Sequence, residues 1–412
     1  MFGLSGLWPR SGPERALTAA TLVSSFGFAA FTTASGLFFV RLIHLTPQTV
    51  GFGLAIAGLI GLGSPLLIGK IADAVDTRTL TVWLFVLQSV LVGCYAFARS
   101  ATMFVVFASA VTFVDRGSWV ARSVLVTRVV GTEQRVRFKA QQRAVFNVGA
   151  ALGALAAALP LQLDTRASYV ALLLVYVASY AVSAVCLAAL PRMTQERTAP
   201  ARHWTAVRDP AYVASAFLAG LLAIHHSLLT IAFPLWVARS TSAPRFLVGV
   251  LIAVNTVLAV VLQVRLSRGG DTVGGAARAG KKGALALVPA CGLLAVAHYG
   301  NALWAGAALA AGIVLLTLGE LWTATAAWGL SYGLAPDKSM GEYQGVFSLG
   351  LSVEGILGPI VATSVVVGWG TPGWFVAGLG FLSLGALVVP IARWGEQTRP
   401  APERAGATAG HP

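Results

Sequence analysis

The chain consists mainly of long apolar runs separated by short polar connections. A run of about 20 mostly apolar residues is long enough to cross a bilayer as a helix, because each helical residue adds about 1.5 Å. This criterion predicts twelve membrane-spanning helices, of which the ninth is short and the tenth long. They cover residues 15–40, 48–68, 80–98, 102–126, 141–163, 167–190, 210–238, 245–265, 283–299, 302–330, 343–367 and 372–393.

The composition places the chain among integral membrane proteins. Of its 412 residues 57% are hydrophobic and only 11% are charged, whereas a soluble domain carries about 25% charged residues. The 45 glycines fit the same class, because small residues allow membrane helices to pack closely. The predicted fold class is therefore an all-α polytopic membrane protein.

Positive charge is distributed unequally between the two sides of the predicted helices. Of 29 lysines and arginines, two lie inside helix 102–126 and five lie on one side. The five are Arg41, Arg99, Arg166, Arg239 and Arg245. The remaining 22, Lys139 and Arg143 among them, flank the helices on the other side. Since cytoplasmic loops carry the excess of lysine and arginine, both termini are predicted to be cytoplasmic in a plasma-membrane protein. The same bias explains the net charge of +14 without a nucleic-acid partner.

The longest polar connection divides the predicted helices into two groups of six. It covers residues 191–209 and is rich in proline, arginine and threonine. We therefore predict an N-terminal bundle at 1–190, a central cytoplasmic loop at 191–209 and a C-terminal bundle at 210–393. Residues 394–412 are predicted to form a disordered cytoplasmic tail.

The two halves resemble each other in sequence. Residues 145–149 read VFNVG and residues 346–350 read VFSLG, an offset of 201. A weaker match sets TFVDRG beside TLGELW and places Asp115 opposite Glu320. Repeated halves with a binding site between them are typical of secondary transporters.

The connection after the second helix resembles a family motif. Residues 69–78 read GKIADAVDTR and are similar to the G-x-x-x-D-R-x-G-R-[RK] motif of the major facilitator superfamily. Gly69, Asp73 and Arg78 match it, and the other three defined positions depart from it. With twelve helices and a central loop, the resemblance covers nearly the whole chain. It implies two pseudo-symmetric six-helix bundles and transport by alternating access.

The resemblance also implies roles for particular segments. In the family the motif aspartate docks at the cytoplasmic ends of the fourth and eleventh helices and steadies the outward-open state, so Gly69, Asp73 and Arg78 are expected to form a gating loop. A helix N-terminus carries partial positive charge, which suits Asp73. The alternative is that Asp73 merely caps or solvates a loop. Helix 141–163 is also similar to the antiporter motif G-x-x-x-G-P-x-x-G-G at Gly149 and Gly153.

Helix 102–126 carries three charged residues in an otherwise apolar run, namely Asp115, Arg116 and Arg122. Each costs about 2.5–3.5 kcal/mol at a helix centre. Asp115, Trp119 and Arg122 share one helix face, whereas Arg116 points about 100° away and needs a partner from another helix.

Two further acids, Glu320 and Glu354, lie inside predicted helices. Three carboxyls against two arginines leave at least one carboxyl without a full cation partner, which suits a proton carrier. We therefore predict that Asp115, Arg116, Arg122, Glu320 and Glu354 form a proton or substrate network. The alternative is a fully paired network that only fixes helix packing, and Glu354, on one face with two glycines, fits a helix contact.

Other polar residues inside predicted helices are candidates for lining a cavity. Ser25 and Thr32 lie seven residues apart on the first helix, and Trp119 shares the face of Asp115. The remaining candidates are His225, His226 and Thr230 in the seventh helix. The histidines are expected to pack as satisfied side chains, the alternative being that one of them titrates near neutral pH. Arg143 and Asn147 share a face, and their positions fit either pairing with acids or contact with lipid headgroups.

Other classes of function find little support. GAARAGKK at 275–282 approaches a phosphate-binding loop but has Lys282 in place of the hydroxyl residue and follows a membrane helix. The connections hold no Ser/His/Asp or metal-ligand cluster, so an enzyme, a nucleotide, a metal site or a cofactor is not expected. The three cysteines lie in apolar runs and are predicted to pack as small residues.

The sequence therefore predicts a secondary transporter that acts on a small-molecule substrate, with protons as coupling ions, in the lipid bilayer. Helices rich in tryptophan and phenylalanine favour export of a fairly lipophilic drug or metabolite. Uptake by a symporter, or facilitated passage of a small polar solute, is the alternative, and a membrane-embedded enzyme is a third possibility.

Overall fold

The computed structural model describes residue 9 and residues 11–191 and 205–399, and in these ranges the regular structure is entirely helical. It contains twelve helices that are long and apolar enough to cross a membrane, which confirms the predicted fold class. Residues 192–204 of the predicted central loop and residues 400–412 of the predicted tail lie outside the described residues. The last helix extends to Gln397, four residues beyond the predicted end.

The first bundle contains six spans. They are α1 (Gly12–Leu42), α2 and α3 (Pro47–Gly61 and Ser64–Ala74) as one interrupted span, α4 with the short η2 (Thr77–Gly93 and Cys94–Phe97), α5 (Ala101–Val129), α6 (Arg135–Leu163) after the 3-10 turn η3 (Thr132–Gln134), and α7 (Arg166–Ala188).

The second bundle repeats this order. It comprises α8 to α10 (Pro210–Leu222, His225–Ser227 and Phe233–Ser240) with the π-helical η4 (Leu228–Ala232), α11 (Leu247–Leu266), α12 (Val273–Val296), α13 (Ala302–Gly333), η5 (Asp337–Ser339), α14 (Met340–Ile360) with the π-helical η6 (Val361–Val367), and α15 (Thr371–Gln397).

Side-chain caps fix where many of these helices begin. A serine, threonine, aspartate or asparagine accepts a hydrogen bond from an N–H of the first turn, which satisfies a donor that has no partner inside the helix. Such caps precede α1, α2, α4, α5, α7, α8, α12 and α13. The helices α6 and α14 have no side-chain cap of this kind from the preceding residue, and this matters for how the bundles meet.

Two predicted helices were too short at their N-termini. The fifth span was predicted from residue 141, but α6 begins at Arg135, and Arg135 and Lys139 in its first turns donate hydrogen bonds to α5. The ninth was predicted from residue 283, but α12 begins at Val273. Residues 275–282, which resemble a phosphate-binding loop, are therefore helical, and the N–H of Gly275 already donates to the hydroxyl of the capping residue Thr272.

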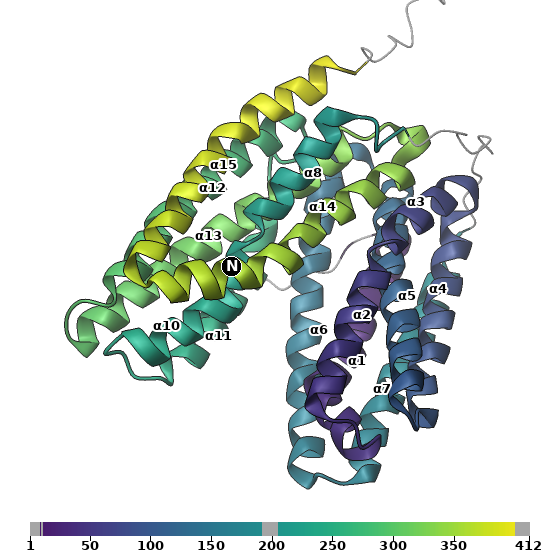
Figure 1. The fold of residues 1–412 in the computed structure, drawn as a ribbon. Coiled ribbons are helices and arrows are strands. Elements are labelled where there is room, and N and C mark those ends of the chain that lie inside the picture. The colour runs from purple at the N-terminus through teal and green to yellow at the C-terminus, as the bar shows by residue number, and fades with distance from the viewer. Residues whose placement is uncertain (1–8, 10, 192–204, 400–412) are drawn as a thin grey trace, which may run out of the picture.

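The two bundles lean together at one end and diverge toward the other (Figure 1). We call the end where α1 begins and α15 ends the terminal end, and the opposite end the far end. The helices α3, α8 and the start of α14 meet at the terminal end, where α14 packs on both α3 and α8. The fold therefore places the contacts between bundles near the terminal end.

Glycines allow the closest helix contacts inside the first bundle. A Cβ on Gly153 would lie 2.1 Å from the carbonyl oxygen of Phe26, and one on Gly149 would lie 2.0 Å from the hydroxyl of Ser25. Since lipid offers no hydrophobic drive for helix association, such close packing stabilises α1 against α6 by dispersion. The motif-like glycines of α6 therefore act here as a packing face.

The seventh span is discontinuous. Residues 223 and 224 form a turn between α8 and α9, and the π-helical η4 follows before Pro234 in α10. Pro234 and π-helical turns both interrupt regular helix hydrogen bonding. Broken helices of this kind occur where a membrane protein lines a cavity.

Candidate functional site

Asp73 at the end of α3 caps a helix of the other bundle. Its carboxylate accepts hydrogen bonds from the backbone N–H groups of Gly341, at 2.6 Å, and Glu342, at 2.8 Å. These donors belong to the first turn of α14, which has no side-chain cap of its own. A carboxylate at a helix N-terminus also interacts favourably with the helix dipole. Asp73 therefore links the two bundles at the terminal end, at the helix where the family resemblance implies that it docks.

The other two residues of the predicted gating loop lie differently. A Cβ on Gly69 would lie 2.2 Å from the carbonyl oxygen of Gly341, so only glycine allows α3 and α14 to approach this closely. Arg78 donates a hydrogen bond to the carbonyl oxygen of Ala188 at the end of α7. That contact is internal to the first bundle, because α4 and α7 both belong to it. Gly69 and Asp73 form the contact between bundles, and Arg78 supports it only from within its own bundle.

A second carboxylate provides the mirror-image contact. Asp271, in the connection before α12, accepts a hydrogen bond of 3.0 Å from the N–H of Val136 in the first turn of α6. Burial raises the pKa of Asp271 above its ordinary value, while the N–H of Val136 opposes the shift. The helices α6 and α14, which have no side-chain cap from the preceding residue, thus each receive one from the opposite bundle. An ion pair of 3.6 Å between Arg135 and Asp337 lies beside them.

An ion pair joins the bundles deeper in the molecule. Arg143 of α6 contacts the carboxylate of Glu320 in α13, which also accepts a hydrogen bond of 3.0 Å from the amide of Asn255 in α11. The Glu320 side chain is 7% exposed, against 29% for Arg143. Three helices from two bundles therefore meet at one buried carboxylate.

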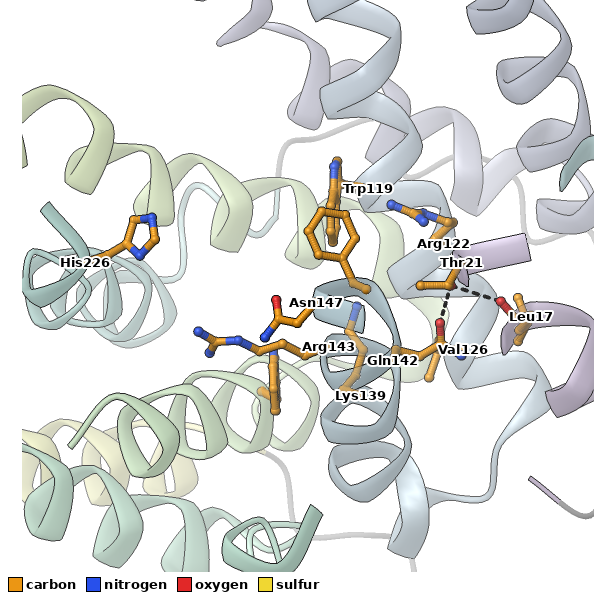
Figure 2. A pocket seen from close by; sticks show the side chains of 12 residues that line it. Leu17, Thr21, Trp119, Arg122, Val126, Lys139, Gln142, Arg143, Asn147 and His226 are labelled. Atoms are coloured by element: carbon orange, nitrogen blue, oxygen red, sulfur yellow. Dashed lines mark hydrogen bonds between the residues drawn. The ribbon is translucent and has the colours of Figure 1, made fainter. Parts of the chain in front are cut away.

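A cavity of about 340 Å³ lies between the bundles next to this ion pair. Figure 2 shows that His226 faces it from the second bundle, opposite Trp119 and Arg122 of α5 and the polar face of α6. Its lining consists of Leu17, Thr21, Trp119, Arg122, Val126, Lys139, Gln142, Arg143, Phe146, Asn147, His226 and Trp328. This volume is in the range of small-ligand sites, and the mixture of aromatic and polar groups is typical of them.

A second cavity of about 270 Å³ adjoins the first. Both include Arg143, His226 and Trp328, and the second also includes His225, Glu320 and Glu354. Glu354 accepts a hydrogen bond of 2.6 Å from the hydroxyl of Ser227 next to the break in the seventh span. The structure thus brings both predicted glutamates and both predicted histidines to one cavity.

The predicted network does not form a single cluster. Asp115 accepts a hydrogen bond of 3.4 Å from the hydroxyl of Tyr180 inside the first bundle. Arg116 points elsewhere on α5, as its helix position predicts, and lies 3.4 Å from the hydroxyl of Ser352 in α14. Asp115 and Glu320 occupy corresponding helices, but those helices belong to different bundles, and Asp115 lines neither cavity.

Arg122 is placed on the wall of the first cavity. Its guanidinium lies 4.4 Å from the ring centroid of Trp119 and 5.5 Å from that of Phe85. Such distances give favourable cation–π contacts. The predicted helix face of Trp119 and Arg122 therefore does line a cavity.

Three predicted lining residues do not line either cavity. Ser25 is 1% exposed and packs between α1 and α6, donating its hydroxyl to the carbonyl oxygen of Leu22. Thr32 and Thr230 are exposed and donate to carbonyl oxygens four residues earlier in their own helices. A hydroxyl satisfied within its own helix needs no polar cavity, and periodicity alone does not reveal this.

Several lining residues were not singled out from the sequence as cavity residues. Lys139 and Arg143 lie among the charges that flank the predicted helices, and nothing in the sequence marks Thr21, Gln142 or Trp328 as cavity residues. Gln142 is recognisable afterwards by its partners, since it exchanges hydrogen bonds with Thr18 and Thr21 of α1. The shared face of Arg143 and Asn147 was the one signal that pointed here.

Comparisons with known proteins point to one protein family. A profile of the Major Facilitator Superfamily matches residues 17–353. Among solved structures, a bacterial homologue of the iron transporter ferroportin in an outward-facing state superposes with a TM-score of 0.75 at 13% identity, covering 93% of this chain and 99% of that chain. The human organic anion transporter MFSD10 superposes with a TM-score of 0.67 at 16% identity, covering 93% of this chain and 99% of that chain.

A third solved structure is the FucP transporter in its outward conformation, with a TM-score of 0.66 at 14% identity over 92% of this chain and 99% of that chain. Similarity at these identities concerns the fold. The comparison with curated protein sequences gives no match.

Proposed function

Since the chain belongs to the Major Facilitator Superfamily, we propose that it exports a small amphipathic molecule across the plasma membrane in exchange for protons. The terminal end is the cytoplasmic end in this proposal, as the bias of lysine and arginine predicts. The structure then corresponds to a state closed to the cytoplasm, with the cavities between the bundles above the closed end.

The observation that carries the proposal is the ion pair between Arg143 and Glu320, because it joins the two bundles through a buried carboxylate. Opening at the terminal end requires α6 and α13 to separate. An unpaired carboxylate in such a site is costly, whereas a protonated one is not. A proton taken up by Glu320 therefore removes the attraction that holds the bundles together and permits opening.

The exchange follows from this order of events. Glu320 accepts a proton from the far side, the bundles separate at the terminal end, and the proton leaves there. Substrate enters the cavity from the terminal side while Arg143 is released from Glu320. Closure then restores the ion pair and presents the substrate to the far side. His225 and Glu354 line the same cavity as Glu320 and provide the route by which the proton reaches it.

The two helix-capping carboxylates keep the terminal end closed until Glu320 takes up a proton. Asp73 and Asp271 each accept hydrogen bonds from the first turn of a helix in the opposite bundle. These contacts stabilise the closed state without depending on substrate. In this proposal the two carboxylates keep the terminal end closed, and protonation of Glu320 allows it to open.

An efflux measurement tests the proposal. Cells with and without the protein are loaded with a panel of amphipathic fluorescent dyes, and dye retention is followed before and after a protonophore is added. We expect at least one dye to be retained less in expressing cells, with the difference abolished by the protonophore. The Glu320→Gln variant should lose the proton-dependent difference, whereas Glu396→Gln, at an exposed site, should keep it.

Two other results would contradict the proposal. Greater dye accumulation in expressing cells would establish uptake instead of export. A difference that survives the protonophore, or that survives Glu320→Gln, would show that Glu320 does not couple transport to protons.

A further inference from the structure

Two cations on the wall of the first cavity have no carboxylate partner. Arg122 and Lys139 both line it, and neither takes part in an ion pair with any carboxylate among residues 9, 11–191 and 205–399. Lys139 donates one hydrogen bond of 2.9 Å, to the hydroxyl of Ser123. The Nε of Arg122 is buried without a hydrogen-bond partner in the same described ranges. Charges at this depth normally pair with one another or serve a ligand.

The nearby acids do not neutralise this pair of cations within contact distance. Glu320 is engaged by Arg143 and Asn255. Asp115 attracts Arg122 electrostatically but forms no ion pair with it, accepts its hydrogen bond from Tyr180 and is not among the residues that line the cavity. The cavity wall therefore presents an excess of positive charge.

Aromatic side chains surround the same space. Trp119, Phe146 and Trp328 line the cavity, and Trp119 also packs against Phe146 with ring centroids 5.6 Å apart. Rings offer large apolar contact surfaces to a planar ligand. An anionic group near the cations and a flat apolar body against the rings would occupy this cavity together.

Building on the proposed function, we infer that the transported molecule is an organic anion, with a carboxylate, sulfonate or phosphate bound between Arg122 and Lys139. The planar guanidinium matches the geometry of such groups. The apolar body of the anion packs between Trp119, Phe146 and Trp328. Nothing in this assignment depends on which carboxyl moves the coupling proton.

A binding experiment with matched probes tests the inference. The purified protein in phosphatidylcholine nanodiscs is titrated with 2-naphthoate, 2-naphthalenesulfonate and 2-naphthyl phosphate, and with the neutral 2-naphthamide, and binding is followed by calorimetry and by quenching of tryptophan fluorescence. At least one anion is expected to bind about tenfold or more tightly than the amide, as one charge-assisted hydrogen bond implies.

Variants locate the site. Arg122→Gln and Lys139→Gln should each weaken binding of that anion about tenfold and leave the weak binding of the amide unchanged, whereas Arg122→Lys should retain part of the preference for the anion. Lys282→Gln removes a cation from an exposed position on α12 and should change nothing. Thermal unfolding of every variant shows whether it remains folded, and Arg122→Lys covers the case in which Arg122→Gln does not.

Equal binding of the anions and the amide would overturn the inference, as would tight anion binding that survives both glutamine substitutions. Because binding is measured without a proton gradient, it is independent of export and coupling. Selective anion binding by a protein that fails the efflux test would refute only the transport direction or coupling. Export of neutral dyes without anion selectivity would refute only the substrate class.

Discussion

Among single residues, Arg143 and Glu320 carry the largest expected energetic effect. Removing one partner of a buried ion pair leaves an uncompensated charge and costs about 3–5 kcal/mol, whereas removing both costs much less. We therefore expect Arg143→Ala to lower the thermal unfolding temperature of the detergent-solubilised protein more than the double variant Arg143→Ala/Glu320→Ala does. Additive effects of the two single substitutions would show that the contact contributes no coupling energy.

The sequence revealed some of the site residues and concealed others for a physical reason. A glutamate or histidine inside an apolar run stands out, so Glu320, Glu354, His225 and His226 were predicted to matter, and all four line a cavity. Arg143 was assigned to a flanking connection because it follows several charged residues. The sequence records that a cation is near a helix end but not that the helix end is buried against another bundle.

At the scale of helices, the start of α14 depends on a residue that is 268 positions away in the chain, because Asp73 caps Gly341. An N-cap substituted by alanine typically costs about 0.5–2 kcal/mol. We expect Asp73→Ala to impair transport strongly and Asp73→Asn to impair it less, since the asparagine oxygen still accepts one hydrogen bond. Expression and membrane insertion should match the unsubstituted protein. Full transport by Asp73→Ala would reduce Asp73 to an ordinary loop residue.

The equivalent contact at α6 predicts a pH effect of definite sign. Burial raises the pKa of Asp271 in the closed structure, where Glu133 acts in the same direction and Arg137 opposes it. If opening exposes Asp271 to water and restores its ordinary pKa, the closed state binds the proton more tightly. The contribution of Asp271 to closure is therefore present at low pH and lost as pH rises through the raised pKa.

Two substitutions separate the charge from the hydrogen bond at this position. Asp271→Asn should keep the terminal end closed and remove this contribution to its pH dependence, because the amide oxygen still accepts from Val136. Asp271→Ala should loosen closure at every pH. Labelling of a cysteine introduced at Val136 by a membrane-impermeant maleimide measures closure, and identical labelling of the asparagine and alanine variants would contradict this account.

Some helix boundaries could not be predicted from the hydrophobic pattern. The twelve spans were predicted from hydropathy, but the early starts of α6 and α12 were not, because both begin with residues whose polarity is typical of loops. The break between α8 and α9 has no proline at residues 223 and 224 and therefore has no local signal. Each feature depends on contacts with other helices, which a local pattern does not contain.

On the scale of the whole molecule, the distribution of lysine and arginine predicts the orientation in the membrane. A reporter fused at the C-terminus should read cytoplasmic, and one inserted at 239–244, between α10 and α11, should read external. Twelve spans place both ends of the helical part on one side. An inverted reading would reverse the transport direction proposed above while leaving the fold unchanged.

The repeat between the halves was visible in the sequence, but the conformation was not. The segments at 145–149 and 346–350 fall in α6 and α14, which hold equivalent places in the two bundles. Which end is closed depends on a few contacts between the bundles, such as those of Asp73, Asp271 and Glu320. Alternating states of one sequence share the same hydrophobic pattern, so the pattern cannot choose between them.

The central claim is that a proton on Glu320 releases the closed end, and a distance measurement tests it without a substrate. Spin labels are placed at the exposed residues Thr79 and Arg268 at the terminal ends of the two bundles, after the three native cysteines are replaced by alanine. Asp271→Asn is included throughout, so that its carboxyl does not titrate.

Pulsed electron–electron resonance on this protein in nanodiscs gives the distribution of distances between the two labels as a function of pH. The account predicts one short distance at high pH, a second, longer distance that grows as pH falls, and the longer distance at every pH in Glu320→Gln. A distribution that changes neither with pH nor with Glu320→Gln would contradict the claim.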